Sequence, residues 1–313
     1  MQRIINKLYH YKKNPKLLGI AILSHLAPII PDKQYLKWIF RLEMGHKLNL
    51  KNPKTFCEKI QWLKLYNRKP EYTQMVDKFA VKEYVANIIG NEYIIPTLGV
   101  WDRFEDIDFD KLPNQFVLKT THGGGNTGVV ICRDKSKLDR NAARKRLNKS
   151  LQISLYDQLR EWPYKDVERR IIAEEYLGCI GNTDLIDYKF YCFNGQPLYC
   201  QVIKDRNSKE TIDFFDQEWN HQVFYGLNLY GRNPKAIQSS YPINRPINYD
   251  KMVEVASKLS HNIPFARVDL YNIGGKIYFG EITFFPASGY GVFTPSEWDY
   301  KLGNLIKLPN LYL

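Results

Sequence analysis

The chain has 313 residues, 44% of them hydrophobic and 14% aromatic, which is enough for two or three subdomains with a substantial core and excludes a disordered chain. Its formal net charge of +12 indicates an acidic partner, which charge alone does not identify as nucleic acid, an anionic membrane or an anionic substrate. Because no nucleic-acid recognition motif accompanies the charge, we expect no nucleic-acid partner.

The cysteines are scattered along the chain without C-x-x-C spacing, which argues against a disulfide framework or a zinc site. A reducing, cytoplasmic compartment is their natural setting. They are Cys57, Cys132, Cys179, Cys192 and Cys200.

The N-terminal region joins a basic, aromatic segment, residues 1–16, to an apolar run, residues 17–30. The run has 14 residues, whereas a membrane-spanning helix takes about 20 apolar residues. Pro28 and Pro31 interrupt it and no small-residue cleavage site follows, so a cleaved signal peptide is disfavoured. We expect a helix that either packs into the core or lies at the inner face of an anionic membrane as a peripheral contact.

Residues 35–90 show the apolar spacing of helices. Thr55 and Glu58 predict a capping box at the start of one helix, and the pattern over residues 75–90 predicts another that ends at Gly90. Beyond residue 90, β-prone and helix-prone segments alternate along the chain, which predicts an α+β fold. The expected elements are short strands before residue 133, helices over 137–170, strands over 171–230, a helix near 249–260 and a final strand pair.

The stretch VLKTTHGGGNTG, residues 117–128, ends a β-prone run with a lysine and follows it with three glycines. Glycine lets backbone N–H groups approach a ligand closely, and a lysine beside such amides suits a phosphate. The stretch matches neither the Walker motif nor G-x-G-x-x-G, and a flexible hairpin turn is the alternative interpretation. Its candidate residues are Lys119, His122, Gly123, Gly124 and Gly125.

Residues 267–283 contain two β-prone halves that meet near a glycine pair, which predicts a hairpin with a three-residue loop. In this register Arg267 lies opposite Glu281. Asp269 then lies opposite Phe279, and polar residues share one face while aliphatic residues share the other. The two carboxylates predict a Mg²⁺ site completed by nucleotide phosphates, and an amphipathic hairpin with a solvated face is the alternative. The polar residues of this face are Arg267, Asp269, Glu281 and Thr283.

Two more segments, RRIIAEEYLG at 169–178 and DYKFYCFNGQP at 187–197, each predict a strand with one wet face. In chain order, the helix MVDKFAVKEYV and these segments resemble the ATP-grasp superfamily, whose members clasp ATP between two α+β subdomains. The resemblance covers about residues 75–290, and the nearest branch is the TupA-like group, associated with teichuronopeptide and other bacterial surface polysaccharides.

The resemblance implies ATP and Mg²⁺ as cofactors and assigns the ATP-binding residues. Lysines that reach the phosphates are implied at Lys78, Lys119 and Lys189. The flap that closes over them is implied at Gly123, Gly124 and Gly125. Glu174 is implied to contact the adenine amino group or the ribose. The backbone at Glu175 and Leu177 is implied to contact the adenine edge.

The resemblance also implies the catalytic end of the site. Arg267 would hold an acyl phosphate or its tetrahedral adduct, and His122 would lie at the site. The family commonly has Glu-x-Asn where this chain has Glu281 and Thr283, and a hydroxyl ligates Mg²⁺ more weakly than an amide oxygen. The implied Mg²⁺ ligands are Asp269, Glu281 and Thr283. We also expect that removing either acid slightly stabilises the metal-free chain, because like charges then no longer repel.

The implied organisation has four parts: a helical N-terminal extension (1–70), a pre-ATP-grasp segment (71–115), a flap subdomain (116–175) and a C-terminal subdomain with the metal site (176–313). The implied activity is an ATP- and Mg-dependent carboxylate–amine ligase acting through an acyl phosphate. Its partners would be an acidic sugar or polysaccharide carboxylate and an amine donor.

Two other enzyme classes stay open at this point. A glycosyltransferase would use an Asp-x-Asp motif, and residues 105–112 offer Asp106, Asp108 and Asp110, although a solvated connector is the favoured interpretation of that segment. A phosphotransferase would use the same ATP site with a hydroxyl acceptor on a sugar.

Overall fold

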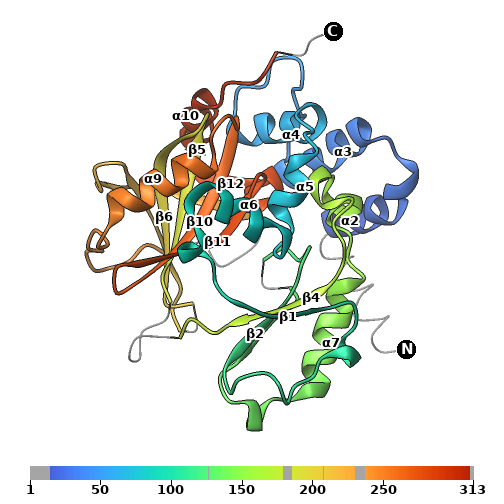
Figure 1. The fold of residues 1–313 in the computed structure, drawn as a ribbon. Helices are drawn as coiled ribbons and strands as arrows, with labels where there is room; N and C mark the ends of the chain where they lie inside the picture. Colours follow the sequence, from blue (N-terminus) through green and yellow to red (C-terminus); the bar gives the residue numbers. More distant parts are fainter. Residues whose placement is uncertain (1–14, 126, 179–184, 207, 230–236, 311–313) are drawn as a thin grey trace.

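A computed structural model describes residues 15–125, 127–178, 185–206, 208–229 and 237–310; residues 1–14 of the basic segment 1–16, and Cys179, lie outside these ranges. Figure 1 shows a smaller subdomain around β1, β2, β4 and α7 below a larger one that carries the remaining sheet and most helices. The helices are α2 Pro15–Leu26, α3 Asp32–Met44, α4 Phe56–Tyr66, α5 Glu71–Val76, α6 Ala80–Ile89, α7 Arg140–Leu151, α8 Leu155–Leu159, α9 Tyr249–Leu259 and α10 Glu297–Leu305. The strands are β1 Thr97–Trp101, β2 Phe116–Thr120, β3 Val129–Cys132, β4 Ile171–Glu175, β5 Asp187–Phe193, β6 Gln196–Lys204, β7 Thr211–Asp216, β8 His221–Gln222, β9 Tyr225–Leu229, β10 Phe265–Ile273, β11 Lys276–Thr283 and β12 Gly291–Thr294.

The smaller subdomain is an antiparallel sheet of order β1-β4-β2-β3 with α7 packed against β2 and β3. It has its own hydrophobic core, which includes Phe116 and Leu118 of β2 and Leu147 of α7. Because side chains alternate along a strand, burial of Phe116 and Leu118 leaves Lys119 on the opposite face. Strand β1 comes from the segment 71–115, which we expected to precede the flap; its pairing with β4 makes it part of the flap sheet.

The larger subdomain is built on a sheet of order β11-β10-β5-β6-β7-β8. Helix α9 covers one face through Met252, Val255 and Leu259, which lie on one side of the helix. Strand β5 is buried along its whole length, as expected for a strand with neighbours on both sides and layers on both faces. The face opposite α9 is turned toward the flap sheet.

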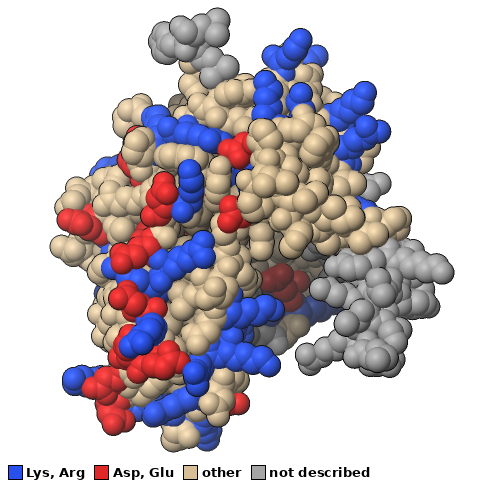
Figure 2. All heavy atoms as spheres, turned by 90° about the vertical axis from the view of Figure 1, so that its right-hand side faces the viewer, with Lys and Arg blue, Asp and Glu red and all other residues tan. Residues whose placement is uncertain are grey.

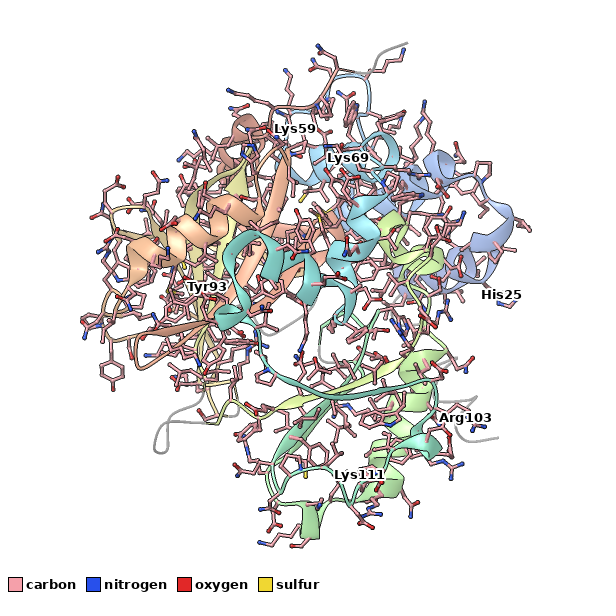
Figure 3. All side chains as sticks on the ribbon, viewed as in Figure 1. His25, Lys59, Lys69, Tyr93, Arg103 and Lys111 are labelled. Atoms are coloured by element: carbon pink, nitrogen blue, oxygen red, sulfur yellow. The ribbon has the colours of Figure 1, made fainter. Side chains whose placement is uncertain are left out.

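Helices α3 and α4 of the N-terminal extension belong to the main core. Tyr35 of α3 and Phe56 of α4 are fully buried there. Helix α4 begins with the predicted capping box: Glu58 N donates to Thr55 Oγ1 at 3.1 Å, and Thr55 N donates to Glu58 Oε2 at 3.3 Å. Helix α2 differs, because none of its residues is buried, and His25 lies at the outer edge of the molecule (Figure 3).

The single helix expected over residues 75–90 is divided into α5 and α6. Asp77 ends α5 in an extended conformation, and its Oδ1 accepts hydrogen bonds from the amides of Phe79 and Ala80, which start α6. Because the Asp77 side chain caps α6 only one residue after α5 ends, it favours a break between the two helices. The break places Lys78 between the two helices, and α6 still ends before Gly90 as predicted.

The loop of the β10–β11 hairpin is one residue shorter than expected. Ile273 pairs with Lys276, so the turn consists of Gly274 and Gly275, with φ of 60° and 89°. Two consecutive positive φ values define the tight hairpin turn that glycine makes readily. The predicted three-residue loop and its register are therefore wrong.

A β-bulge at Gly280 then shifts the register again. A Cβ at this position would lie 3.0 Å from the carbonyl oxygen of Asp269, which explains the glycine. Beyond the bulge Asp269 lies opposite Glu281, and Arg267 lies opposite Thr283. Two one-residue shifts restore the original alternation, so the predicted shared face of these polar residues is confirmed.

Candidate active site

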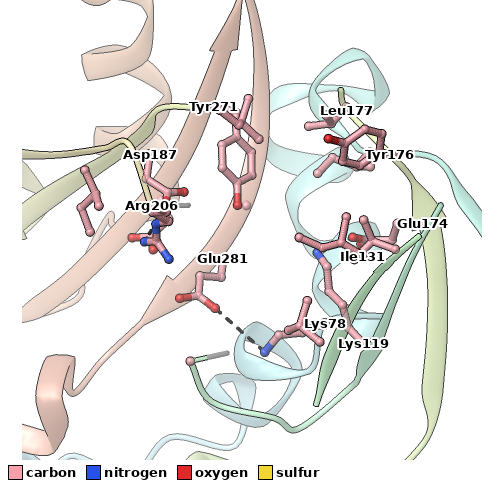
Figure 4. A pocket seen from close by; sticks show the side chains of 18 of the residues that line it. Lys78, Lys119, Ile131, Glu174, Tyr176, Leu177, Asp187, Arg206, Tyr271 and Glu281 are labelled. Carbon is pink, nitrogen blue, oxygen red and sulfur yellow. Dashed lines mark ion pairs between the residues drawn. The ribbon is translucent and has the colours of Figure 1, made fainter. Parts of the chain in front are cut away.

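A cavity of about 800 Å³ lies between the two sheets. Figure 4 shows its two walls: Asp187, Tyr271 and Glu281 belong to the large sheet, and Glu174 and Lys119 to the flap sheet. The lining carries seven Lys or Arg residues and five Asp or Glu residues. An excess of cations with a few carboxylates suits a polyanion accompanied by a metal ion. The charged lining residues are Lys78, Lys119, Arg133, Arg146, Lys189, Arg206, Arg267, Glu174, Glu175, Asp187, Asp269 and Glu281.

Glu174 of β4 holds two lysines in place. Its Oε1 lies 2.8 Å from Lys82 Nζ, and its Oε2 pairs with Lys119 Nζ. Burial alone would raise the pKa of this carboxyl, but the ammonium groups of Lys119 and Lys82 outweigh burial and lower the pKa. Glu174 is thus a buried anion that orients Lys119 in the cavity wall. Glu174 also lines the cavity, and its expected contact with adenine or ribose stays a prediction.

Glu175 and Leu177, at the end of β4 and just beyond it, line the cavity as the resemblance implies. The amide of Glu175 donates to the carbonyl oxygen of Pro96 at 3.1 Å, so that group is already engaged. Leu177 lies with Tyr176 on the flap side of the cavity (Figure 4).

Lys78 connects the helix break to the glycine loop. Its amide donates to the carbonyl oxygen of Thr121 at 3.0 Å, and its Nζ donates to the carbonyl oxygen of Gly123. The same Nζ lies 3.9 Å from Glu281 Oε2, so one lysine contacts both the loop and strand β11. Burial lowers the pKa of Lys78, although Glu281 opposes the shift.

The three glycines of the loop serve different purposes. Gly125 lines the cavity and has a φ of 56°, a conformation that other residues adopt with strain. Gly123 is enclosed, because a Cβ there would lie 2.4 Å from Thr120 Oγ1. A Cβ on Gly124 would lie 3.2 Å from the Leu155 side chain. Of the three, only Gly125 lines the cavity.

His122 does not line the cavity. Its ring is buried, and Nε2 donates to the carbonyl oxygens of Ser150 at 3.2 Å and Ile153 at 3.1 Å. Burial lowers its pKa, which keeps the ring neutral. His122 therefore anchors the glycine loop to the end of α7, which corrects its expected place among the reacting groups.

The polar face of the β10–β11 hairpin closes the far end of the cavity. Arg267 grips Asp269 with two donors, Nε to Oδ1 at 2.7 Å and Nη2 to Oδ2 at 2.8 Å. Nη2 also donates to Glu281 Oε1 at 3.0 Å and Thr283 Oγ1 at 3.1 Å. Lys189 of β5, directly opposite Asp269, pairs with Asp269 Oδ2. The structure therefore brings Arg267, Asp269, Glu281 and Thr283 together as expected, adds Lys189 to them, and leaves His122 outside.

The sequence analysis did not predict a charged pair on the large-sheet side of the cavity. Arg206 Nη2 lies 2.5 Å from Asp187 Oδ2, and both line the cavity beside Tyr271 (Figure 4). Asp187 had a detectable signal, because it alternates with Lys189 along β5. Arg206 comes from the connection after β6, where no sequence pattern indicates a site.

A family model described as TupA-like ATPgrasp matches residues 58–307. The chain belongs to the TupA-like ATP-grasp family. The match begins within α4 and includes every candidate site residue, and it confirms the expected ATP-grasp fold with an α+β architecture. A comparison with curated proteins finds no match.

Solved structures similar to this TupA-like ATP-grasp protein include two amino-acid ligases. A D-alanine-D-alanine ligase from Helicobacter pylori has 14% identity and a TM-score of 0.43, over 82% of this chain and 70% of that chain. One from Bacillus anthracis, complexed with ATP, has 16% identity and a TM-score of 0.41, over 74% and 63%. A RimK domain ATP-grasp protein from Sphaerobacter thermophilus has 11% identity and a TM-score of 0.39, over 77% and 70%.

The oxygen donors of this TupA-like ATP-grasp protein fit Mg²⁺ in kind, because two carboxylates and a hydroxyl are hard ligands. Glu281 is the more available, with 35% of its side chain exposed against 3% for Asp269. Both oxygens of Asp269 already pair with Arg267 or Lys189. Among the described residues no group of three or more His, Cys, Asp and Glu could hold a metal on its own. A Mg²⁺ ion would therefore need phosphate oxygens as further ligands.

Asp269 and Glu281 lie close together, and the neighbouring cations offset the repulsion between the two carboxylates. Burial alone would raise the pKa of Glu281, but Lys78, Arg267 and Lys189 lower it to about 2. Removing Asp269 would take a charged partner from Lys189 and Arg267, and removing Glu281 would take one from Lys78 and Arg267. These ion pairs lead us to expect a loss of stability on removing Asp269 or Glu281, in place of the slight gain expected from the sequence.

The Asp-x-Asp alternative fails on position. Asp106 pairs with Arg103 and Asp108 with Lys111, both within the same exposed segment. Neither acid lines the cavity. Arg103 and Lys111 lie at the outer end of the flap subdomain (Figure 3). The segment is the solvated connector that the sequence favours.

Proposed function

We propose that the protein is an ATP- and Mg-dependent carboxylate–amine ligase that acts through an acyl phosphate. The observation that carries the proposal is the meeting of three cations with two carboxylates at the far end of the cavity. Lys78, Lys189 and Arg267 there surround Asp269 and Glu281. Such an arrangement can neutralise a phosphoryl group in transfer and hold a metal beside it.

The proposed reaction has two steps. A substrate carboxylate oxygen attacks the γ-phosphorus of ATP, ADP leaves with the electron pair of the broken P–O bond, and an acyl phosphate forms. An amine nitrogen then attacks the acyl carbon, phosphate leaves, the nitrogen loses a proton, and an amide results. The protein would accelerate the reaction by positioning the reactants and neutralising charge, because the chemistry needs no covalent bond to the protein.

Three side chains have distinct tasks in this proposal. Lys119, oriented by Glu174, and Lys189 neutralise charge on the phosphates. Arg267 holds the acyl phosphate or its tetrahedral adduct. Mg²⁺, held by Glu281 with Asp269 and Thr283 nearby, would polarise the transferred phosphoryl group.

The lining agrees with a reaction that uses no protein nucleophile. Among the described residues no Ser, Cys or His lines the cavity. The described cysteines, Cys57, Cys132, Cys192 and Cys200, are buried thiols in neither disulfides nor metal clusters. We place the reaction in the cytoplasm, where thiols stay reduced and ATP is available.

For the acceptor we propose an acidic sugar or the carboxylate of a bacterial surface polysaccharide or teichuronopeptide-like polymer, joined to an amine donor. Membership of the TupA-like family and the basic lining of the cavity support this choice. A polyanionic acceptor gains from a cavity with excess positive charge.

The test is a screen of the purified protein with Mg-ATP against acidic sugars, polysaccharide fragments and amino acids. We expect phosphate release only when a carboxylate and an amine are both present, with a product mass equal to their sum less water. Phosphate retained on the sugar would identify a phosphotransferase. A nucleoside diphosphate released from a sugar nucleotide would identify a glycosyltransferase, an alternative that none of the comparisons supports.

A further inference from the structure

Helix α2 presents an apolar row to solvent. Leu18, Ile22 and Leu26 recur every fourth residue, so they share one side of the helix, and they are 42%, 51% and 40% exposed. On its inner side Ile20 and Leu23 pack against the main core. The helix is thus held by its inner side, while about half of each outer side chain remains exposed.

Two more apolar side chains are exposed on the elements that follow α2. Ile29 in the turn after α2 is 78% exposed and Trp38 of α3 is 44% exposed. Helices α2 and α3 pack closely, since a Cβ on Gly19 would lie 3.2 Å from Leu42, one turn after Trp38. We call Leu18, Ile22, Leu26, Ile29 and Trp38 the apolar face. Exposed apolar side chains gathered in one place mark an interaction surface.

Basic residues outnumber acidic ones in the part of the sequence that carries the apolar face. Residues 15–54 carry seven Lys or Arg and two Asp or Glu. Both acids are engaged within the protein: Asp32 lies 2.6 Å from Arg68, and Glu43 lies 3.1 Å from Lys16. On α3 the basic residues beside Trp38 are exposed, namely Lys33, Lys37 and Arg41.

Figure 2 shows this side of the molecule, where a broad area with few charged side chains is bordered above by Lys and Arg. An apolar area edged by cations is the pattern of a helix that lies in a membrane interface. Tryptophan is enriched at that depth because its ring is apolar and its N–H is polar. In the part of the chain that the structure describes, no helix is long and apolar enough to cross a bilayer.

We propose that the apolar face docks on an anionic lipid bilayer, with Leu18, Ile22, Leu26 and Ile29 entering the interface. Lys33, Lys37 and Arg41 then lie against the lipid headgroups. A second copy of the chain is a poorer partner for the same face, because it would bring like charges together. The proposal concerns where the protein works and does not depend on the reaction at the cavity.

The test is co-sedimentation of the full-length protein with vesicles that contain phosphatidylglycerol and with vesicles of phosphatidylcholine alone. We expect binding to the first, weak binding to the second, and weaker binding as salt is added. Ile22→Glu and Ile29→Glu should each lower the partition coefficient about tenfold or more, because a charge replaces an inserted apolar side chain. The paired change Lys33→Gln and Lys37→Gln should lower only the binding to anionic vesicles.

Val223→Glu is the matched control, because Val223 is equally apolar, is 79% exposed and lies between β8 and β9. It should bind vesicles as the wild type does, and all variants should share its thermal midpoint. Equal wild-type binding to both vesicle types, or none to either, would overturn the proposal. So would a lipid-free dimer that Ile22→Glu dissociates, since a second copy would then cover the face. Full retention of vesicle binding by Ile22→Glu and Ile29→Glu, with loss only on deletion of residues 1–14, would overturn it as well.

Discussion

At the residue scale, Lys119 owes its position to Glu174 on the neighbouring strand. Both residues line the cavity, Glu174 buried and Lys119 partly exposed, and the ammonium group lies beside the space where phosphates are expected. We predict that Lys119→Ala weakens Mg-ATP binding by roughly 10- to 100-fold, the effect of losing a charge-assisted hydrogen bond of about 1.5–3 kcal/mol. Calorimetric titration measures this directly. Lys111→Ala, which removes an exposed lysine of the same subdomain, is the control. Unchanged affinity in folded Lys119→Ala protein would refute the assignment.

The acids of the hairpin lead to a second prediction at this scale. Asp269→Asn and Glu281→Gln should each reduce turnover by orders of magnitude, and the double variant should lose little more, because both act through one site. Asp269→Asn should also lower the free energy of unfolding by about 3 kcal/mol, since Arg267 and Lys189 lose their buried anion.

Kinetic assays and urea denaturation check the two parts separately. Asp250→Asn, which changes an exposed acid paired with Arg245, should leave both quantities as in the wild type. Retained turnover in either folded variant would contradict the metal assignment. Increased stability of Asp269→Asn would contradict the ion-pair account.

The hairpin also shows what sequence can and cannot predict. The alternation of polar and aliphatic residues predicted the shared face of Asp269 and Glu281, because strand periodicity depends only on local spacing. The register was out of reach, because it depends on a two-glycine turn and on a bulge at Gly280 that brings no distinctive pattern. The expected role of His122 was based on its position next to the glycines in the sequence. Its actual partners, Ser150 and Ile153, lie in α7 and the segment after it, and sequence spacing does not indicate such long-range contacts.

At the element scale, helix α4 holds the segment that follows strand β11. Lys64 is fully buried and donates to the carbonyl oxygen of Leu159 at 2.8 Å, and to Ser288 O and Oγ at 2.9 and 2.7 Å. Ala287 and Ser288 both have positive φ, 46° and 53°, a strained conformation that needs support from its surroundings. The lysine therefore fixes the backbone just beyond β11.

This buried lysine makes stability depend on pH. Burial lowers the pKa of Lys64 from 10.5 to about 7, although Glu161 opposes the shift. Between these values the unfolded chain binds a proton that the folded chain does not, so stability rises with pH by up to about 1.4 kcal/mol per unit. We predict this rise, between about pH 8 and about pH 9.5, in the difference between wild type and Lys64→Met.

Urea denaturation at several pH values gives the comparison. Lys301→Met, which changes an exposed lysine of α10, should follow the wild type across the range. Parallel curves for wild type and Lys64→Met would show that the lysine stays charged at these pH values and would contradict the prediction.

At the scale of the whole molecule, the order of weak motifs was more informative than any one of them. Segments between residues 75 and 290 that are far apart in sequence meet around one cavity, and the family match spans the same region. The N-terminal extension could not be placed from sequence, because burial of Tyr35 and Phe56 in the main core depends on long-range packing. The pair of Asp187 and Arg206 was missed for the same reason, since the arginine follows β6 in a connection.

The central claim is that the cavity activates a carboxylate by phosphorylation, and trapping with hydroxylamine tests it most directly. An acyl phosphate reacts with hydroxylamine to give a stable hydroxamate, so the amine donor need not be known. With Mg-ATP and an acidic acceptor, the account predicts a hydroxamate formed in equal amount with ADP and free phosphate, and its loss in Glu281→Gln. Consumption of ATP with phosphate retained on the acceptor and no hydroxamate, or release of AMP and pyrophosphate, would contradict it.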